Sequence, residues 1–232
     1  MGTLKPTPLK MSTTLRVLAH LLGYPGAELR AHLPELRSAL HDERALTFGR
    51  LAELDALIDR LRTRHALDVE ADYVELFDRG RGTALHLFEH VHGDSRDRGQ
   101  AMVDLAQTYD RAGLLLAPGE LPDYLPVVLE FASTQPPAAA REFLRETAHI
   151  VRVIMSALLE HGSPYASVLA AVLDLAGERA DPVPLAAEPA LDESWQEPEA
   201  FGGCSSAGQS RPNEPQPVHI VRPARAPQRT AA

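Results

Sequence analysis

The stretch Leu87-Phe-Glu-His-Val-His-Gly-Asp-Ser-Arg-Asp-Arg-Gly-Gln-Ala-Met-Val-Asp-Leu105 sets two histidines, four acidic residues, two arginines and a glutamine around the apolar start of a helix. Met102 and Leu105 continue to Tyr109 at intervals of three and four residues, which is the spacing of one helix face. The stretch has no interruption in which a catalytic loop could be placed. A segment that is half core-forming and half specifically polar indicates a helical surface that recognises a partner.

The same helical spacing recurs along most of the chain before residue 177. Apolar residues fall at i, i+4, i+7 and i+11 twice near the N-terminus, and similar faces follow downstream. No convincing period-two alternation indicates strands. The sequence therefore predicts an all-α fold, a single compact domain of about eight helices. Besides the helix that carries Met102, the expected helices cover 11–22, 29–40, 51–61, 69–76, 124–131, 144–158 and 165–173.

Short polar residues indicate where several of these helices begin. Asp68, Ser95, Asp123 and Ser163 each precede or open an apolar periodic run, and their side chains are suited to accept free N–H groups of a first helical turn. Pro164 is suited to the first helical position, where its missing N–H has no cost.

The chain divides by composition into three parts. Residues 1–12 are expected to be a flexible N-terminus, and residues 13–177 form the helical domain. Residues 178–232 are rich in proline and alanine, and nine of the nineteen prolines fall after residue 180. Such a segment buries too little apolar surface to offset the entropy lost on ordering, so a largely disordered tail is predicted. An acidic-aromatic island at 191–201, with Trp195, is either idle or a docking peptide.

Charge and cysteine content narrow the class of protein. The net charge of −9 disfavours a nucleic-acid binder or a partner of anionic lipid and suits a basic or amphipathic peptide partner. A single cysteine, Cys204, rules out an internal disulfide framework and fits a reducing compartment. No secretory signal and no apolar run of about 20 residues is present. We expect a cytoplasmic protein that does not insert into a membrane.

The segment His86-Leu-Phe-Glu-His90 matches H-x-x-E-H, a pattern of zinc peptidases. On a helix, the two histidines would share a face and could both bind zinc, with Glu89 as general base. This chemistry needs a third ligand that no second signature identifies. A zinc-dependent hydrolase is therefore the alternative function, and histidines hydrogen-bonded at a helix end are the simpler interpretation.

Three further segments have a structural and a functional interpretation. Residues 78–82 lack the frame of a phosphate-binding loop and are predicted to form a helix-breaking turn with solvated arginines. Arg96 and Arg98 could hold an anion at a helix N-terminus or pair with neighbouring acidic residues. The segment Glu120-Leu-Pro-Asp-Tyr-Leu-Pro-Val-Val-Leu-Glu130 is a rigid, acid-bearing entry to an apolar helix, which suits peptide capture or an ordinary loop-to-helix junction.

Three segments together closely resemble the NarJ family, the assembly chaperones of membrane-bound respiratory nitrate reductase. They are Tyr73-Val-Glu-Leu-Phe-Asp-Arg-Gly-Arg-Gly82, the opening stretch 87–105, and Glu120-Leu-Pro-Asp-Tyr-Leu-Pro126. The resemblance extends from Thr14 to about Gly177. It implies an all-helical chaperone without catalytic residues, metal or cofactor of its own.

In this family the implied partner is the apo form of the catalytic, molybdenum-containing subunit, particularly its N-terminal segment. The resemblance implies that the chaperone keeps this subunit competent for insertion of the molybdenum cofactor and an iron–sulfur cluster. It also implies that membrane docking waits until loading is complete, and that the chaperone is absent from the mature enzyme. No nucleic acid is implied as a partner.

These implications lead to a predicted client-binding site within the resembling segments. An apolar groove lined by Phe88, Val91, Met102 and Leu105 would take one face of a client segment. Nearby carboxylates would attract basic client residues, and two histidines would make capture depend on pH near neutrality. The predicted client-binding residues are Phe88, Glu89, His90, Val91, His92, Asp94, Arg96, Arg98, Gln100, Asp123 and Tyr124.

Overall fold

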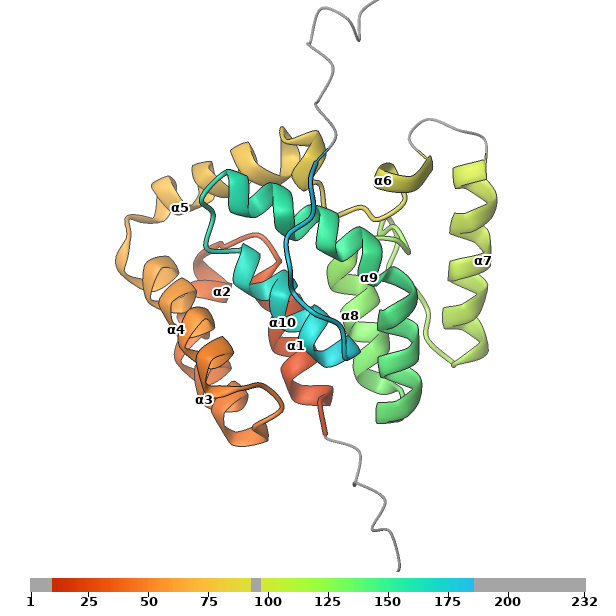
Figure 1. Cartoon of the computed structure of the whole chain (residues 1–232), viewed down its shortest axis with the longest axis horizontal. Helices are drawn as coiled ribbons and strands as arrows, with labels where there is room; N and C mark the ends of the chain where they lie inside the picture. Colours follow the sequence, from red (N-terminus) through yellow and green to blue (C-terminus); the bar gives the residue numbers. More distant parts are fainter. Residues whose placement is uncertain (1–9, 93–96, 186–232) are drawn as a thin grey trace, which may run out of the picture. The chain divides into compact units, whose positions relative to one another are not determined.

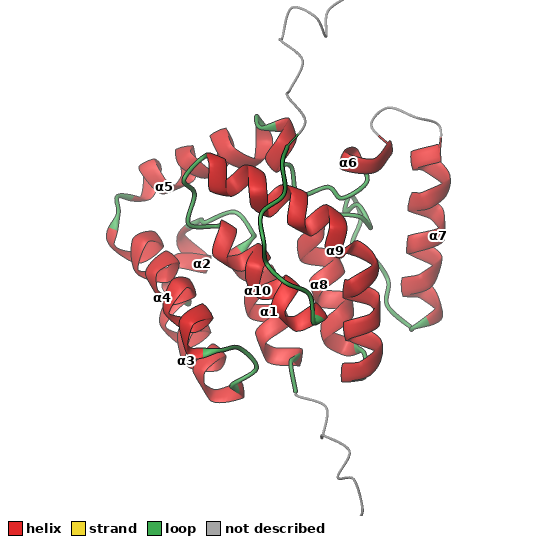
Figure 2. Cartoon of the chain, viewed as in Figure 1, coloured by secondary structure: helices red, strands yellow, loops and turns green. Residues whose placement is uncertain are grey.

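Helices form the regular structure of the two ranges that the structure describes, residues 10–92 and 97–185 of this computed structural model (Figure 2). These ranges contain ten α-helices, a π-helical turn and a 3-10 turn, and their one β-type pairing is an isolated bridge. The all-α class is confirmed, with more helices than the approximately eight predicted. In chain order the elements are α1 (Ser12–Leu21), α2 (Ala27–Ala31), α3 (Leu33–Glu43), α4 (Phe48–Thr63), α5 (Ala66–Tyr73), η1 (Val74–Asp78), η2 (Arg81–Thr83), α6 (Glu89–His92), α7 (Asp97–Arg111), α8 (Leu125–Thr134), α9 (Pro137–Glu160) and α10 (Ala166–Ala176).

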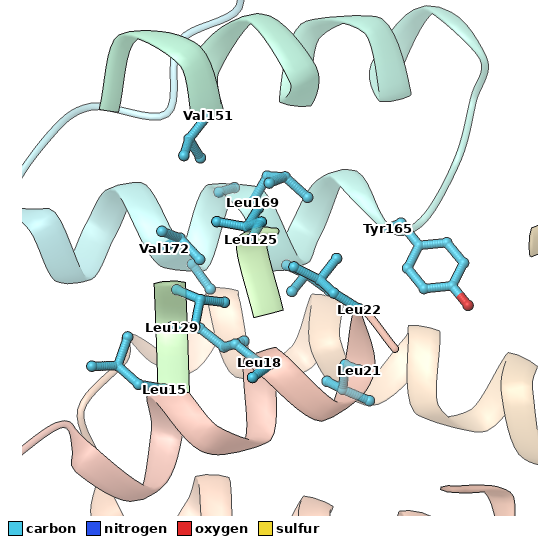
Figure 3. Packing of buried hydrophobic residues seen from close by; sticks show 14 of the residues in the cluster. Leu15, Leu18, Leu21, Leu22, Leu125, Leu129, Val151, Tyr165, Leu169 and Val172 are labelled. Atoms are coloured by element: carbon cyan, nitrogen blue, oxygen red, sulfur yellow. The ribbon is translucent and has the colours of Figure 1, made fainter. Parts of the chain in front are cut away.

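Helix α10 lies at the centre of the core and packs against α9, α4 and α1. All of its residues except Ser167 and Asp174 are buried, as expected for a helix that is apolar on every side. Val151 of α9 points toward α10, and Leu18 of α1 approaches α10 from the opposite side (Figure 3). The apolar runs predicted at 144–158 and 165–173 thus form the two halves of a central helical hairpin.

Helix α1 lies between this hairpin and α3, and it packs along α8. Leu15, Leu18 and Leu22 are fully buried, which confirms the predicted apolar face of the first helix. Ser12 Oγ donates a 2.6 Å hydrogen bond to the carbonyl of Ser133 and joins the start of α1 to the end of α8. Both α1 and α8 line the site described below.

The helix predicted over 29–40 is two helices, α2 and α3, separated at His32. Pro34 occupies the first turn of α3 and has no N–H to donate to an earlier carbonyl. A proline at this position ends the preceding helix and is tolerated at the start of the next one. The leucine spacing alone predicted a continuous helix, and this prediction was wrong because it overlooked Pro34.

Three predicted helix starts are displaced by a few residues. Helix α5 begins at Ala66, so Asp68 lies inside its first turn, where a negative charge is favourable. Helix α10 begins at Ala166, two residues after Pro164, and Ser163 Oγ accepts a 3.3 Å hydrogen bond from the N–H of Tyr165. Helix α8 begins at Leu125. The predicted cap Ser95 lies outside the described residues.

Residues 178–185 leave α10 and run along α9 (blue in Figure 1). Arg152 of α9 contacts the Glu178 carboxylate at 3.2 Å and donates to the carbonyl of Arg179 at 3.2 Å. The N–H of Val183 donates to Ser156 Oγ at 2.9 Å. These eight residues were predicted to belong to the disordered tail, yet α9 supplies polar partners that hold them. Residues 186–232 lie outside the described part of the chain, as do residues 1–9.

The segment after α5 contains the tight turn predicted at 78–82. Thr83 Oγ1 donates to the carbonyl of Leu76, and a Cβ added to Gly80 would lie 2.6 Å from that carbonyl oxygen. Glycine is therefore required by close packing at this position. Arg79 is exposed and pairs with Glu75 at 2.9 Å, which fits the predicted turn with solvated arginines. None of the helices in the described ranges is long and apolar enough to cross a membrane.

Candidate functional site

A short backbone pairing joins two of the segments that the sequence analysis selected. The N–H of Leu87 donates to the carbonyl of Asp123 at 3.0 Å, and the N–H of Leu125 donates to the carbonyl of Leu85 at 2.9 Å. The two hydrogen bonds flank an antiparallel bridge between His86 and Tyr124. Segments far apart in the sequence thereby form one unit, which we call the Asp123 joint (residues 84–88 and 123–125).

Asp123 holds this joint through its side chain. The carboxylate is fully buried and accepts a 3.1 Å hydrogen bond from the N–H of Phe88. Its other oxygen lies 3.4 Å from His86 Nδ1. A buried carboxylate of this kind orders the loops and does not meet a client at the surface. The predicted attraction of basic client residues by Asp123 therefore does not fit its position, and neither does its predicted role as a simple helix cap.

His86 is the titratable partner of this carboxylate. The hydrogen bond to Asp123 raises the pKa of His86 above its usual value, and partial burial of the ring opposes the shift. Glu89 raises this pKa further, whereas Arg98 lowers it. The imidazole also lies against the Tyr124 ring, with centroids 5.1 Å apart. His86 therefore forms an ion pair with Asp123 only when its imidazole is protonated.

The geometry contradicts the zinc-hydrolase alternative. His86 precedes α6, so His86 and His90 do not share the face of one helix. His86 faces Asp123, and His90 Nε2 lies 2.8 Å from the carbonyl oxygen of Ala84. Within residues 10–92 and 97–185 there is no group of three or more metal-ligating side chains placed to hold an ion. The simpler interpretation, histidines hydrogen-bonded at a helix end, fits both residues.

The other described residues of the predicted site, apart from Tyr124, lie directly before α6, in α6 or in α7. Phe88 is half-buried and packs against the core, whereas Val91 is half exposed. Arg98 pairs with Glu89 at 3.2 Å, which favours the ion-pair interpretation over anion binding. Gln100 donates to Asp104 at 2.8 Å. His92 belongs to α6. The predicted residues Asp94 and Arg96 lie outside the described residues.

Tyr124 connects the joint to α5 and to the end of α1. Its hydroxyl lies 3.5 Å from the hydroxyl of Tyr73, which donates a 2.8 Å hydrogen bond to the carbonyl of Leu22. Tyr24 packs edge-on against Tyr73, with ring centroids 5.7 Å apart. This row of tyrosines leads from the buried joint to a surface hollow.

That hollow has a volume of about 790 Å³ and lies between α1, the α2–α3 segment and the start of α8. Four exposed glutamates line it, and no lysine or arginine of the described residues does. We call it the acidic groove. Its lining residues with polar or aromatic side chains are His20, Tyr24, Glu28, His32, Glu35, Glu120, Tyr124 and Glu130.

An apolar hollow of about 330 Å³ continues from the acidic groove. The two hollows share four lining residues, among them Glu120 and Glu130, so they form one surface. The apolar end is lined by Leu114, Leu115 and Leu116 and by Phe131 of α8. Arg16 also lines this end, where its Nε donates a 3.2 Å hydrogen bond to Ser133 Oγ. Leu115 has 88% of its surface exposed and adds apolar surface to this end. The combined surface offers apolar contact at one end and negative charge at the other.

Only part of this surface was predicted from the sequence. Tyr124 was a predicted site residue, and the 120–130 segment was interpreted as suited to peptide capture. Glu28 and Glu35 were missed because they lie on α2 and α3, about 90 residues from Glu120. Three consecutive leucines at 114–116, ahead of a proline and a glycine, were the available signal for the apolar end. His20 and His32 line the groove, whereas His90 and His92 were the residues predicted to make client capture depend on pH.

The fold is shared with a protein of known structure. A crystal structure from Archaeoglobus fulgidus, described as a candidate redox enzyme maturation protein, superposes with a TM-score of 0.51. It covers 76% of this chain and 99% of its own, at 18% sequence identity. This likeness concerns the fold alone.

The family follows from the sequence. Residues 26–171 match the family described as nitrate reductase delta subunit, and the chain belongs to this family. The nitrate reductase molybdenum cofactor assembly chaperone NarJ of Escherichia coli K12 is 40% identical over 193 residues, covering 79% of this chain and 82% of the relative. A probable chaperone of the same description from Bacillus subtilis 168 is 33% identical over 163 residues, covering 69% and 86%. The resemblance to the NarJ family is thus confirmed.

Proposed function

We propose that this protein is an assembly chaperone for respiratory nitrate reductase. It binds the apo catalytic subunit by its N-terminal segment and holds it competent for insertion of the molybdenum cofactor and an iron–sulfur cluster before membrane docking. The names of its relatives support the client, and the function requires no covalent chemistry from the chaperone. The observation that carries the proposal is the groove whose acidic and apolar ends are continuous.

The groove fits an amphipathic segment of the client. An apolar client face packs against Leu116, Val127 and Phe131, which is the helix-in-groove mode of recognition. Cationic client residues on the same segment then face Glu120 and Glu130, which lie in both hollows. Because these carboxylates are exposed, they contribute mainly to the rate and specificity of association and weaken with salt.

The Asp123 joint positions residues that line the groove. It fixes Tyr124 and the loop that carries Glu120, because Asp123 binds the backbone of the 84–88 segment. The exposed residues of α6 and α7, such as Val91 and Gln100, form the second part of the proposed client surface. In this arrangement the joint acts by positioning, and contact with the client is made on either side of it.

Calorimetric titration tests the groove directly. The full chain is titrated with a peptide that copies the N-terminus of the cognate catalytic subunit. We expect saturable one-to-one binding, weakened roughly tenfold in the double variant Glu120→Gln and Glu130→Gln, because two charge contacts are lost. Glu142→Gln is the matched control, since Glu142 is exposed on α9 and lies outside both hollows. Equal affinity in all three proteins would place the client elsewhere.

A further inference from the structure

A separate pocket of about 380 Å³ lies between the end of α4, α5 with the following turns, and the loop from α9 to α10. Its wall is apolar, with Leu57, Leu61, Leu76 and Pro164 among the lining residues. Its rim carries three arginines, Arg60, Arg64 and Arg79, together with Asp72 and Glu75. We call it the arginine pocket. It shares no lining residue with the acidic groove or its apolar extension.

The spacing of α4 brings the apolar and basic groups to one place. Leu57, Arg60 and Leu61 lie at intervals of three and one residues and share one face of α4, and Arg64 follows directly after the last residue of this helix. The leucines are buried, whereas the guanidinium groups are partly exposed at the pocket rim. A pocket of this volume with an apolar wall and a few polar groups has the properties of a small-molecule site.

Tyr165 contributes a buried hydroxyl to the pocket. Its side chain is 94% buried, since 6% of its surface is exposed, and the described residues give its hydroxyl no hydrogen-bond partner. Figure 3 shows this hydroxyl turned away from the leucine and valine side chains of the core. Burial raises the pKa of Tyr165, the Asp72 carboxylate raises it further, and the Arg60 guanidinium opposes this by lowering it. An unpaired buried hydroxyl has a free-energy cost that a ligand acceptor would remove.

The rim also has guanidinium donors that no acceptor of the described residues uses. Arg64 donates to Asp72, and Arg60 lies 3.5 Å from the same carboxylate oxygen and donates no side-chain hydrogen bond to any described residue. Arg79 pairs with Glu75. Three guanidinium groups therefore face two carboxylates, which leaves one positive charge in excess. Unused donors and excess positive charge both favour a ligand with negatively charged acceptor oxygens.

We propose that the arginine pocket binds a small organic anion, with a phosphate or carboxylate group at Arg60 and the Tyr165 hydroxyl and an apolar body against Leu61, Leu76 and Pro164. The planar guanidinium of Arg60 donates to the anionic oxygens, and the Tyr165 hydroxyl donates to the same group. This site does not overlap the client groove, because the two surfaces have no lining residue in common.

Two simple probes test the site on the full chain. Phenyl phosphate and sodium benzoate carry an apolar ring with a phosphate or a carboxylate, and the two arms distinguish these anions. Inorganic phosphate has the anionic group without the apolar ring, and phenol has the ring without the anionic group. We expect one of the aryl anions to bind saturably in an amide NMR titration, with shifts at residues 57–64 and 161–165. Each half-probe should bind at least tenfold more weakly.

Substitutions separate a binding role from a structural one. Tyr165→Phe removes a hydroxyl without a partner, so the free protein should keep or gain thermal stability while affinity for the aryl anion falls several-fold. Arg60→Gln should weaken the aryl anion roughly tenfold. The control is Arg62→Gln on the same helix, because Arg62 pairs with Asp59 and does not line the pocket.

Two results would overturn this proposal. One is the absence of saturable binding by both aryl anions. The other is binding that Tyr165→Phe and Arg60→Gln leave unchanged. Neither result would affect client binding in the acidic groove, so failure of this inference and failure of the proposed function remain distinguishable.

Discussion

The central α9–α10 hairpin and the Asp123 joint both have buried residues at their centre, but different interactions stabilise them. The hairpin rests on leucine, valine and alanine contacts, whereas the joint rests on a carboxylate that accepts a backbone N–H. Apolar burial is non-directional and tolerates small shifts, while a buried hydrogen bond requires both partners in place. The hairpin therefore determines stability, and the joint determines where the loops beside the groove lie.

The largest expected effect is on the hairpin. Leu169→Ala removes a fully buried side chain of α10 and should lower the free energy of unfolding by about 2–5 kcal/mol, measured by denaturant titration. Leu159→Ala on α9 is the matched control, because 48% of that side chain is exposed, and it should change stability by about 0.5 kcal/mol or less. Similar losses for both variants would refute the packing described here.

An intermediate effect is expected at the joint. Asp123→Ala leaves the N–H of Phe88 without its acceptor and should destabilise the fold by about 1–3 kcal/mol. From the sequence, this residue was instead predicted to belong to the client-binding site. Asp123→Asn retains one acceptor oxygen and should recover part of this lost stability. Thermal unfolding of the wild type and both variants measures the difference. A fully stable Asp123→Ala protein would contradict a structural role for the carboxylate.

A smaller effect is the pH dependence of the joint. Because the folded-state pKa of His86 is raised, its protonation stabilises the fold. This contribution is fully present below the unfolded-state value of about 6.5 and is lost as pH rises through the folded value. Its size is modest, since one third of the side chain is exposed. His86→Gln should flatten this part of the plot of stability against pH. An unchanged curve would contradict the stabilising interaction between protonated His86 and Asp123.

The same contrast explains how much of the molecule was predictable from sequence. The hairpin was predictable because Leu144, Val151, Met155 and Leu158 repeat at helical spacing over a long segment. The joint was not, because a hydrogen bond between residues 88 and 123 depends on how distant loops meet. The acidic groove is an intermediate case: the 120–130 wall was recognised locally, whereas its opposite wall required the fold.

The most direct test of the account is amide hydrogen exchange of the full chain with and without the client peptide. The groove predicts added protection in residues 20–36 and 114–131, the two walls of the continuous surface. It predicts little change in residues 57–64, which line the arginine pocket. Protection confined to 57–64, or none in 114–131, would contradict the groove as the client site.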